Sequence, residues 1–146
     1  MEERYSSAMT DFTVIGKFRN KEKVRELIAL IRSKGKTCYD FTAKAADPSQ
    51  PHASGEEQMC ALESHPDFLN DPIHRNHFET DLAGLQNAQT VVLLLPAGTS
   101  AHIEAGIAFG LHKKLILIGE PEKPETLYFI FDEYYKTTDD FIKSLR

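Results

Sequence analysis

The chain has 146 residues, the size of one compact domain, so a second full domain is not expected. Its 17 Lys and Arg residues against 22 Asp and Glu residues give a net charge of −5, which argues against a binder of nucleic acid polymers. The longest apolar run, residues 91–95, is too short to cross a bilayer, and the first residues hold no apolar signal segment. We therefore expect a cytoplasmic protein with no membrane partner.

The first part of the chain predicts a βαβ unit. A flexible polar tail over Met1–Asp11 is expected to precede a strand at Phe12–Gly16, and Lys21–Lys34 has the apolar spacing of an amphipathic helix. Gly35 suits the end of that helix, and Thr37–Phe41 is a second β-rich run. Strand, helix and strand within about 30 residues predict a parallel pair.

The rest of the chain alternates helices and strands. The segment Thr42–Gly55, poor in large apolar residues, is predicted to be a long functional loop. The expected elements after it are helices at Glu56–Glu63, Ile73–Gln86, Ser100–Leu111 and Thr138–Leu145, and strands at Thr90–Leu95, Lys114–Ile118 and either Tyr128–Phe131 or Tyr134–Lys136. This order predicts one α/β domain over residues 12–146, a doubly wound, mostly parallel sheet of about five strands with helices on both faces, flavodoxin-like or Rossmann-like.

The cysteines and histidines indicate neither a disulfide framework nor a metal site. Cys38 and Cys60 are too few for either, and both are expected to be buried. His74 and His77 could share a metal, but no further ligand stands at a convincing spacing. His102 lies about 200° around its predicted helix from the carboxylate of Glu104, so it is expected to face the loop or solvent.

The loop after the first strand is one of two places where a sheet of this kind binds ligands. Gly16 permits a tight turn, Arg19 supplies a fork of hydrogen-bond donors for an anion, and Phe18 offers an apolar face to a flat ring. The alternative is that Lys17 and Arg19 are solvated and Phe18 belongs to the core. Neither a GxGxxG fingerprint nor a Walker A lysine motif is present.

The loop after the third strand combines small residues with a carboxylate. Thr99 or Ser100 can cap the helix, and Gly98 permits a ligand to approach the backbone closely. The helix dipole favours Glu104 near the helix start, but its spacing from Ser100 does not fit a capping box. A carboxylate fixed there could act as a nucleophile or stabilise a developing cation. Asp81, on the helix that leads into the third strand, is a second candidate, unless it is simply solvated.

Two stretches, residues 12–42 and 81–118, carry the motifs of a known family. They contain the segment DFT, the loop PAGTSAHIEAG and the buried strand KLILI. These stretches resemble the nucleoside 2-deoxyribosyltransferase-like superfamily, in particular an uncharacterised bacterial branch related to nucleotide N-glycoside hydrolases. The resemblance covers most of the chain and implies the same α/β fold.

The resemblance also implies roles for individual residues. Glu104 matches the glutamate that attacks the anomeric carbon and forms a covalent glycosyl intermediate, and Asp81 matches the aspartate that helps the base to leave. Gly16, Phe18 and Arg19 match the loop that helps to hold the sugar phosphate in nucleotide-hydrolysing relatives. The superfamily further implies a homodimer or larger homo-oligomer, for which the aromatic stretch over residues 127–135 is the candidate interface.

The chain departs from the transferases at two points. Gly98 stands where they carry a second aspartate, and the first strand lacks the tyrosine that steadies their glutamate. We therefore expect cleavage or transfer of the N-glycosidic bond of a nucleoside, nucleoside 5′-monophosphate or related compound, without a metal or redox cofactor. Gly98, Thr99 and Ser100 are expected to bind the substrate. The alternatives are a catalytically weak nucleotide-binding or sensor module and an NAD-cleaving domain.

Overall fold

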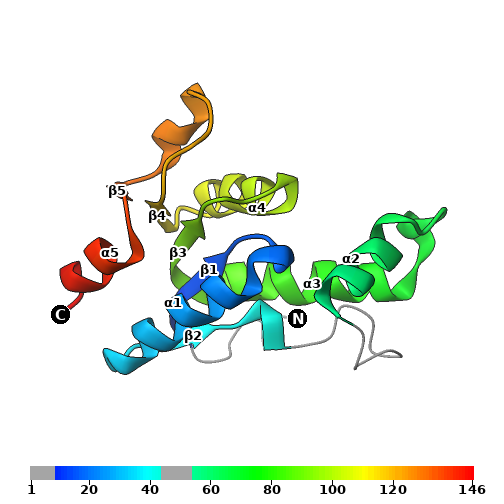
Figure 1. The fold of residues 1–146 in the computed structure, drawn as a ribbon, viewed down its shortest axis with the longest axis horizontal. Helices are drawn as coiled ribbons and strands as arrows, with labels where there is room; N and C mark the ends of the chain where they lie inside the picture. Colours follow the sequence, from blue (N-terminus) through cyan, green and yellow to red (C-terminus); the bar gives the residue numbers. More distant parts are fainter. Residues whose placement is uncertain (1–8, 44–53) are drawn as a thin grey trace.

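A computed structural model describes residues 9–43 and 54–146, and Figure 1 shows how their helices and strands are arranged. The strands are β1 (Thr10–Ile15), β2 (Cys38–Tyr39), β3 (Ala88–Leu94), β4 (Lys114–Ile118) and β5 (Glu133–Tyr135). The α-helices are α1 (Lys21–Ser33), α2 (Gly55–Glu63), α3 (Pro72–Asn87), α4 (Thr99–Gly110) and α5 (Thr138–Ser144). Short 3₁₀ helices are η2 (Phe18–Asn20), η3 (Phe41–Ala43), η4 (Phe68–Asn70) and η5 (Thr126–Ile130).

The described strands form one parallel sheet in the order β2-β1-β3-β4-β5. The register pairs Val14 of β1 with Val92 of β3, and Val92 in turn with Ile116 of β4. The predicted doubly wound α/β fold is therefore confirmed. Because every strand runs the same way, the loops that leave β1, β2 and β3 all emerge at one edge of the sheet.

Both faces of the sheet are covered, as the apolar strands predict. On one face, α1 and α5 pack bulky side chains such as Leu27 and Phe141 against Val14, Val92 and Ile116. On the other face lie Leu85 of α3 and three alanines of α4, over alternate strand residues. Since successive strand residues point to opposite faces, each strand contributes to both layers of the core.

Several predicted boundaries differ from the structure. β1 begins at Thr10, two residues earlier than expected, because Asp11 and Thr37 exchange hydrogen bonds, at 2.8 Å each, that extend the start of the sheet. β2 is only two residues long, since the chain turns into η3 at Phe41. The strand expected at Tyr128–Phe131 is wrong, because those residues belong to η5 and the turn after it.

Other sequence expectations concern the two cysteines and the stretches that the structure does not describe. Cys38 is buried as predicted, but Cys60 is exposed, because it lies on a solvent-facing side of α2. Most of the predicted loop at Thr42–Gly55 and of the predicted tail lies outside the described residues. Among the helices that the structure describes, none combines the length and apolar character that a bilayer crossing requires.

Candidate active site

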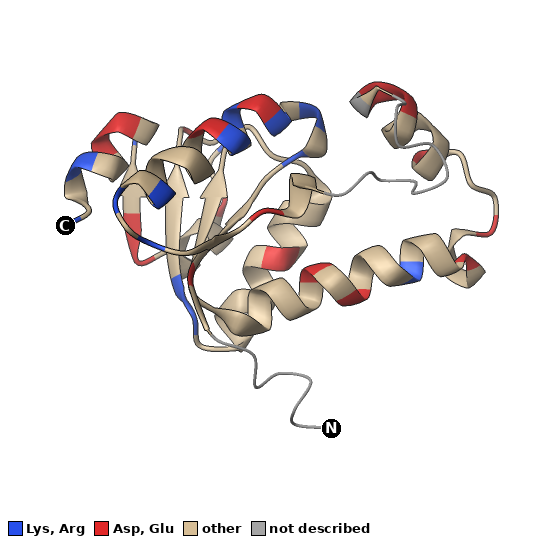
Figure 2. Ribbon diagram, turned by 90° about the horizontal axis from the view of Figure 1, so that it is seen from below, with Lys and Arg blue, Asp and Glu red and all other residues tan. Residues whose placement is uncertain are grey.

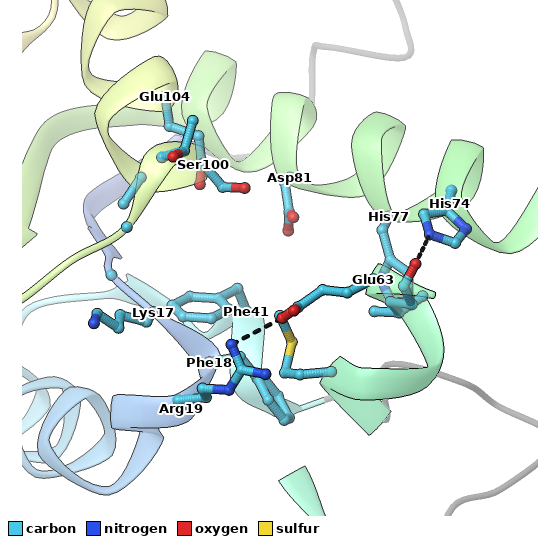
Figure 3. Close-up of a pocket in the computed structure, with 16 residues that line it drawn as sticks. Lys17, Phe18, Arg19, Phe41, Glu63, His74, His77, Asp81, Ser100 and Glu104 are labelled. Atoms are coloured by element: carbon cyan, nitrogen blue, oxygen red, sulfur yellow. Dashed lines mark hydrogen bonds and ion pairs between the residues drawn. The ribbon is translucent and has the colours of Figure 1, made fainter. Parts of the chain in front are cut away.

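A cavity of about 600 Å³ opens at the edge of the sheet where β1, β2 and β3 end (Figure 3). It is bounded by the start of α4, the middle of α3, the loop after β1 and the inner side of α2. Every site residue predicted from the sequence lines this cavity: Gly16, Phe18, Arg19, Asp81, Gly98, Thr99, Ser100 and Glu104. The structure adds Lys17, Phe41, Met59, Leu62, Glu63, His74, His77 and Ala101. Segments far apart in the sequence therefore meet at one site.

The loop after β1 forms one wall of the cavity. A side chain at Gly16 would place its Cβ 3.3 Å from Val24 and 3.4 Å from the carbonyl oxygen of Leu94, so the close approach of β1 to β3 favours glycine here. Phe18 is half-buried against the cavity, and the ammonium group of Lys21 lies 5.1 Å from the centre of its ring. The ring of Phe18 thus supplies an apolar surface within a polar loop.

Arg19 is paired with two carboxylates of α2. Its Nε and Nη2 atoms donate to the two oxygens of Glu56 at 2.7 and 3.0 Å, and its Nη1 atom lies 2.8 Å from Glu63. These contacts raise the pKa of Arg19, and its hydrogen bond lowers the pKa of Glu56. Arg19 therefore lies at the cavity as predicted, but its guanidinium group binds protein carboxylates in this structure.

The start of α4 is capped differently from the prediction. Neither Thr99 nor Ser100 caps the helix, because Gly98 occupies the N-cap position and no side chain accepts a hydrogen bond there. Of the two predicted surroundings of His102, the loop is the one observed: its ring nitrogens contact the Gly98 carbonyl oxygen at 2.7 Å and, in addition, the Tyr128 hydroxyl at 2.8 Å. The first amides of α4 are thus left available to a polar group in the cavity.

Glu104 and Asp81 lie close enough for their charges to interact across α3 and α4. The pKa of Glu104 is raised to about 8, first by burial and second by the negative charge of Asp81. In Figure 3, Asp81 points from α3 into the space opposite the loop after β1, and Glu104 lies next to Ser100 on α4. Two half-buried carboxylates are therefore brought together at the carboxyl edge of the sheet.

Tyr39 is a residue beside both carboxylates that sequence reasoning missed. It closes β2, and its pKa is raised to about 12 by burial, by the charges of Asp81, Glu104 and Asp40, and by its hydrogen bond with Asp81. Its ring packs against Gly84 of α3, where an added Cβ would lie 2.9 Å from two ring carbons. The first strand lacks a tyrosine, as noted from the sequence, but the second strand supplies one beside both carboxylates.

A signal for Tyr39 was present in the sequence. Tyr39 ends a strand at the edge of the sheet where ligands bind. Gly84 lies three residues after Asp81, so both are on the same face of α3. The η3 turn that follows is fixed through Thr42, which accepts a hydrogen bond from Arg25 at 2.8 Å and donates one to Asp40 at 2.6 Å. These bonds hold the end of β2, and Phe41 with it, against the cavity.

The histidines of α3 shape the far end of the cavity. Asp71 caps α3 by accepting from the His74 amide at 3.0 Å, and it contacts the Nδ1 atom of His74 at 2.6 Å. The Nε2 atom of His74 lies 3.0 Å from the Leu62 carbonyl oxygen, so this ring joins α3 to the end of α2. No group of side chains suited to hold a metal ion occurs among the described residues.

Comparisons with known proteins identify the fold. No protein-family model and no curated protein sequence matches the chain. Among solved structures, a 2-deoxyribosyltransferase from the psychrotolerant bacterium Bacillus psychrosaccharolyticus superposes with a TM-score of 0.62 and 14% identity, over 90% of each chain. The CMP N-glycosidase BcmB of Clostridium botulinum superposes with a TM-score of 0.52 and 15% identity, over 92% of this chain and 97% of that one. The chain therefore shares the fold of these two enzymes, as the resemblance stated from the sequence implies.

Proposed function

We propose that the chain cleaves or transfers the N-glycosidic bond of a nucleoside, a nucleoside 5′-monophosphate or a related N-glycoside. One observation carries the proposal: Glu104, Asp81 and Tyr39 converge beside a cavity at the carboxyl edge of a parallel sheet. The two enzymes compared above, which share this fold, act on bonds of this class, one as a transferase and one as a glycosidase. N-glycosyl chemistry also uses paired carboxylates, one of which can act as a nucleophile.

In the proposed reaction, ionised Glu104 attacks the anomeric carbon of the sugar. The bond from that carbon to the base nitrogen breaks, and its electron pair leaves with the base through an oxocarbenium-like transition state. Water, or the nitrogen of a second base, then attacks the same carbon and releases the carboxylate. The positive charge that develops on the sugar favours the ionised form of Glu104 and so offsets its raised pKa.

Asp81 and Tyr39 act on the leaving base and on its geometry. Asp81 points into the cavity, where its carboxylate can bind the base and assist its departure. The Tyr39 hydroxyl donates to Asp81 and holds that carboxylate in one position, so Tyr39 is a positioning residue. Gly98, Thr99 and Ser100 at the start of α4 bind the sugar through their exposed backbone and hydroxyl groups, and Phe18 stacks on the base.

The experiment that tests this function measures release of free base. Wild type and the Glu104→Gln variant are incubated overnight with a panel of nucleosides, their 5′-monophosphates and NAD, and free base is separated by chromatography. We expect release from at least one compound by wild type and a loss of about a thousandfold or more in the variant. The matched control is Glu26→Gln, at an exposed position of α1 outside the cavity, which should keep wild-type activity. Equal activity of Glu104→Gln and wild type would exclude the proposed nucleophile.

A binding or sensor module is the second candidate, and the titration of Glu104 favours it. With a pKa of about 8, most Glu104 side chains carry a proton at neutral pH, and a protonated carboxyl is a poor nucleophile. A module of this kind would show a rise in melting temperature with one nucleoside or nucleotide and no release of base at any pH.

We also propose that the chain forms a homo-oligomer. Phe129 and Leu127 of η5 are 86% and 71% exposed, and Ile103 and Phe109 of α4 are 60% and 55% exposed. Large exposed apolar side chains on neighbouring elements are typical of protein interfaces. Analytical ultracentrifugation should show a dimer or larger species, and Phe129→Asp should shift it toward the monomer.

A further inference from the structure

We propose that Glu56 and Glu63 are specificity residues that keep phosphate away from Arg19, so that the site takes N-glycosides without a phosphate group. The exclusion of phosphate follows from the geometry of three side chains, and the substrate class rests, in addition, on the proposed function.

The contacts of Arg19 are the first argument. Arg19 is the residue that the sequence analysis assigned to a sugar phosphate, and a free guanidinium group would suit that ligand. In the structure its Nε and Nη2 atoms form a two-point contact with Glu56, and its Nη1 atom binds Glu63. The carboxylates therefore use the same planar array of donors that would bind phosphate oxygens.

The charges around Arg19 are the second argument. Helix α2 carries Glu56, Glu57 and Glu63 and no Lys or Arg, and Figure 2 shows these acidic residues of α2 at one end of the molecule. On the opposite wall the cavity presents Asp81 and Glu104. A phosphate dianion placed at Arg19 would displace two carboxylates that stay within reach, and it would face a third in Asp81. The negative charges of these carboxylates oppose the binding of a phosphate dianion.

Two other features of the cavity could receive an anion. They are the side chain of Lys17 and the first amides of α4, which no side chain caps. Backbone amides bind neutral sugar hydroxyl oxygens as well as phosphate oxygens, so the open start of α4 does not by itself require a phosphate. The balance between these groups and the carboxylates is measurable, because a functional phosphate site would also bind inorganic phosphate.

The first test measures binding of inorganic phosphate by calorimetry at low ionic strength. The proteins are wild type, the double variant Glu56→Gln with Glu63→Gln, and the double variant with Arg19→Ala added. The matched control is Glu79→Gln, which removes the carboxylate of another exposed Arg–Glu pair, with Arg75 at 3.2 Å and outside the cavity. We expect the double variant to bind phosphate about ten- to a hundredfold more tightly than wild type, the change typical of hydrogen bonds to a charged group. Adding Arg19→Ala should abolish that gain, and Glu79→Gln should bind like wild type.

The second test compares each nucleoside with its own 5′-monophosphate in the base-release assay. Wild type should have the higher kcat/KM for the nucleoside, and the double variant should shift this ratio toward the monophosphate by about tenfold or more. A wild type that prefers the monophosphate, or a double variant with unchanged phosphate affinity, would overturn the inference. If no compound releases base, the proposed reaction fails, while the calorimetry still decides whether Glu56 and Glu63 exclude phosphate from Arg19. Circular dichroism checks that every variant is folded.

Discussion

The two faces of the sheet are packed with side chains of different size. Under α1 and α5 the helices contribute Val24, Leu27, Ile28, Ile31 and Phe141, all with 2% exposure or less. Under α3 and α4 the buried helix residues are Leu85 and the three alanines at positions 101, 105 and 108, with Gly84 beside Tyr39. No described residue of α1 or α5 lines the candidate site, whereas α3 and α4 carry Asp81 and Glu104.

This difference separates two tasks of the fold. Large aliphatic side chains remove much apolar surface from water and so contribute most to the stability of the domain. Small residues contribute less burial, but they let a helix lie close to the sheet and fix the position of a side chain at its start. The bulky face therefore stabilises the domain, and the face with small residues positions the candidate site.

The largest expected effect comes from truncating one leucine on each face of the sheet, and this pair of variants tests the separation. Leu27→Ala should lower the free energy of unfolding by about 2–5 kcal/mol and leave kcat within about twofold at temperatures where the protein is folded. Leu85→Ala, on α3 next to Gly84, should cost a similar amount of stability and also reduce kcat. Denaturant unfolding and base release measure both quantities. Equal losses of kcat in the two variants would contradict the separation.

The next effect concerns the pH dependence of the carboxylates. Because the pKa of Glu104 is about 8, kcat/KM should rise about tenfold per pH unit below pH 8 and level off above it. Asp81→Asn removes a negative charge that raises this pKa, so the midpoint of the profile should fall. A midpoint that stays at pH 8 in Asp81→Asn would show that the two carboxylates do not interact.

Stability should show the same titration with a defined sign. The pKa of Glu104 is raised in the folded state from its ordinary value of 4.5, so the folded state binds more protons between pH 4.5 and 8. The contribution of Glu104 to the free energy of unfolding therefore falls as the pH rises from 4.5 to 8. The free energy of unfolding of wild type relative to Glu104→Gln, measured at both ends of the window, checks the sign.

The smallest expected effect compares two helix glycines. Gly106→Ala adds a Cβ with no neighbour within 4 Å, so it should stabilise α4 by up to about 1 kcal/mol and leave kcat unchanged. Gly84→Ala gains the same helix propensity but pushes on the Tyr39 ring, whose carbons lie 2.9 Å from the new Cβ. Gly84→Ala should therefore not show the gain in stability expected of Gly106→Ala, and it should lower kcat. Tyr39→Phe should also lower kcat, without any steric effect on the ring. An unchanged kcat in Gly84→Ala would show that the ring can shift without consequence.

Much of the fold could be predicted because its signals are local. The continuous apolar runs of β3 and β4 and the spacing of Val24, Leu27, Ile28 and Ile31 in α1 each indicate one structure. The last strand was ambiguous, since two aromatic stretches could both pair with β4. Hydrogen bonds between Asp132 and Leu115 place the chain so that Glu133–Tyr135 forms β5.

The candidate site was predictable where one loop carries both the backbone turn and the side chains. The loop after β1 follows that rule, as does Glu104 on the helix that begins at the loop after β3, whereas Asp81 lies in the middle of α3. Tyr39 was missed because the resemblance drew attention to a tyrosine in the first strand. The partner of Arg19 could not be predicted either, because Glu56 lies 37 residues further along the chain and their meeting depends on tertiary structure. The exposure of Cys60 could not be predicted for a similar reason, since the sequence of α2 does not mark which side of the helix packs against the fold.

The turn between α1 and β2 lies at the opposite end of the sheet from the candidate site. Gly35 adopts a positive φ of 78° there, with nothing within 4 Å of an added Cβ, and both Lys34 and Gly35 are exposed. Parallel strands keep the two ends of the sheet apart, so a group joined to this turn points away from the cavity. The turn is therefore a natural attachment point for a surface or a reporter dye, through which the domain could be immobilised with its cavity facing solution.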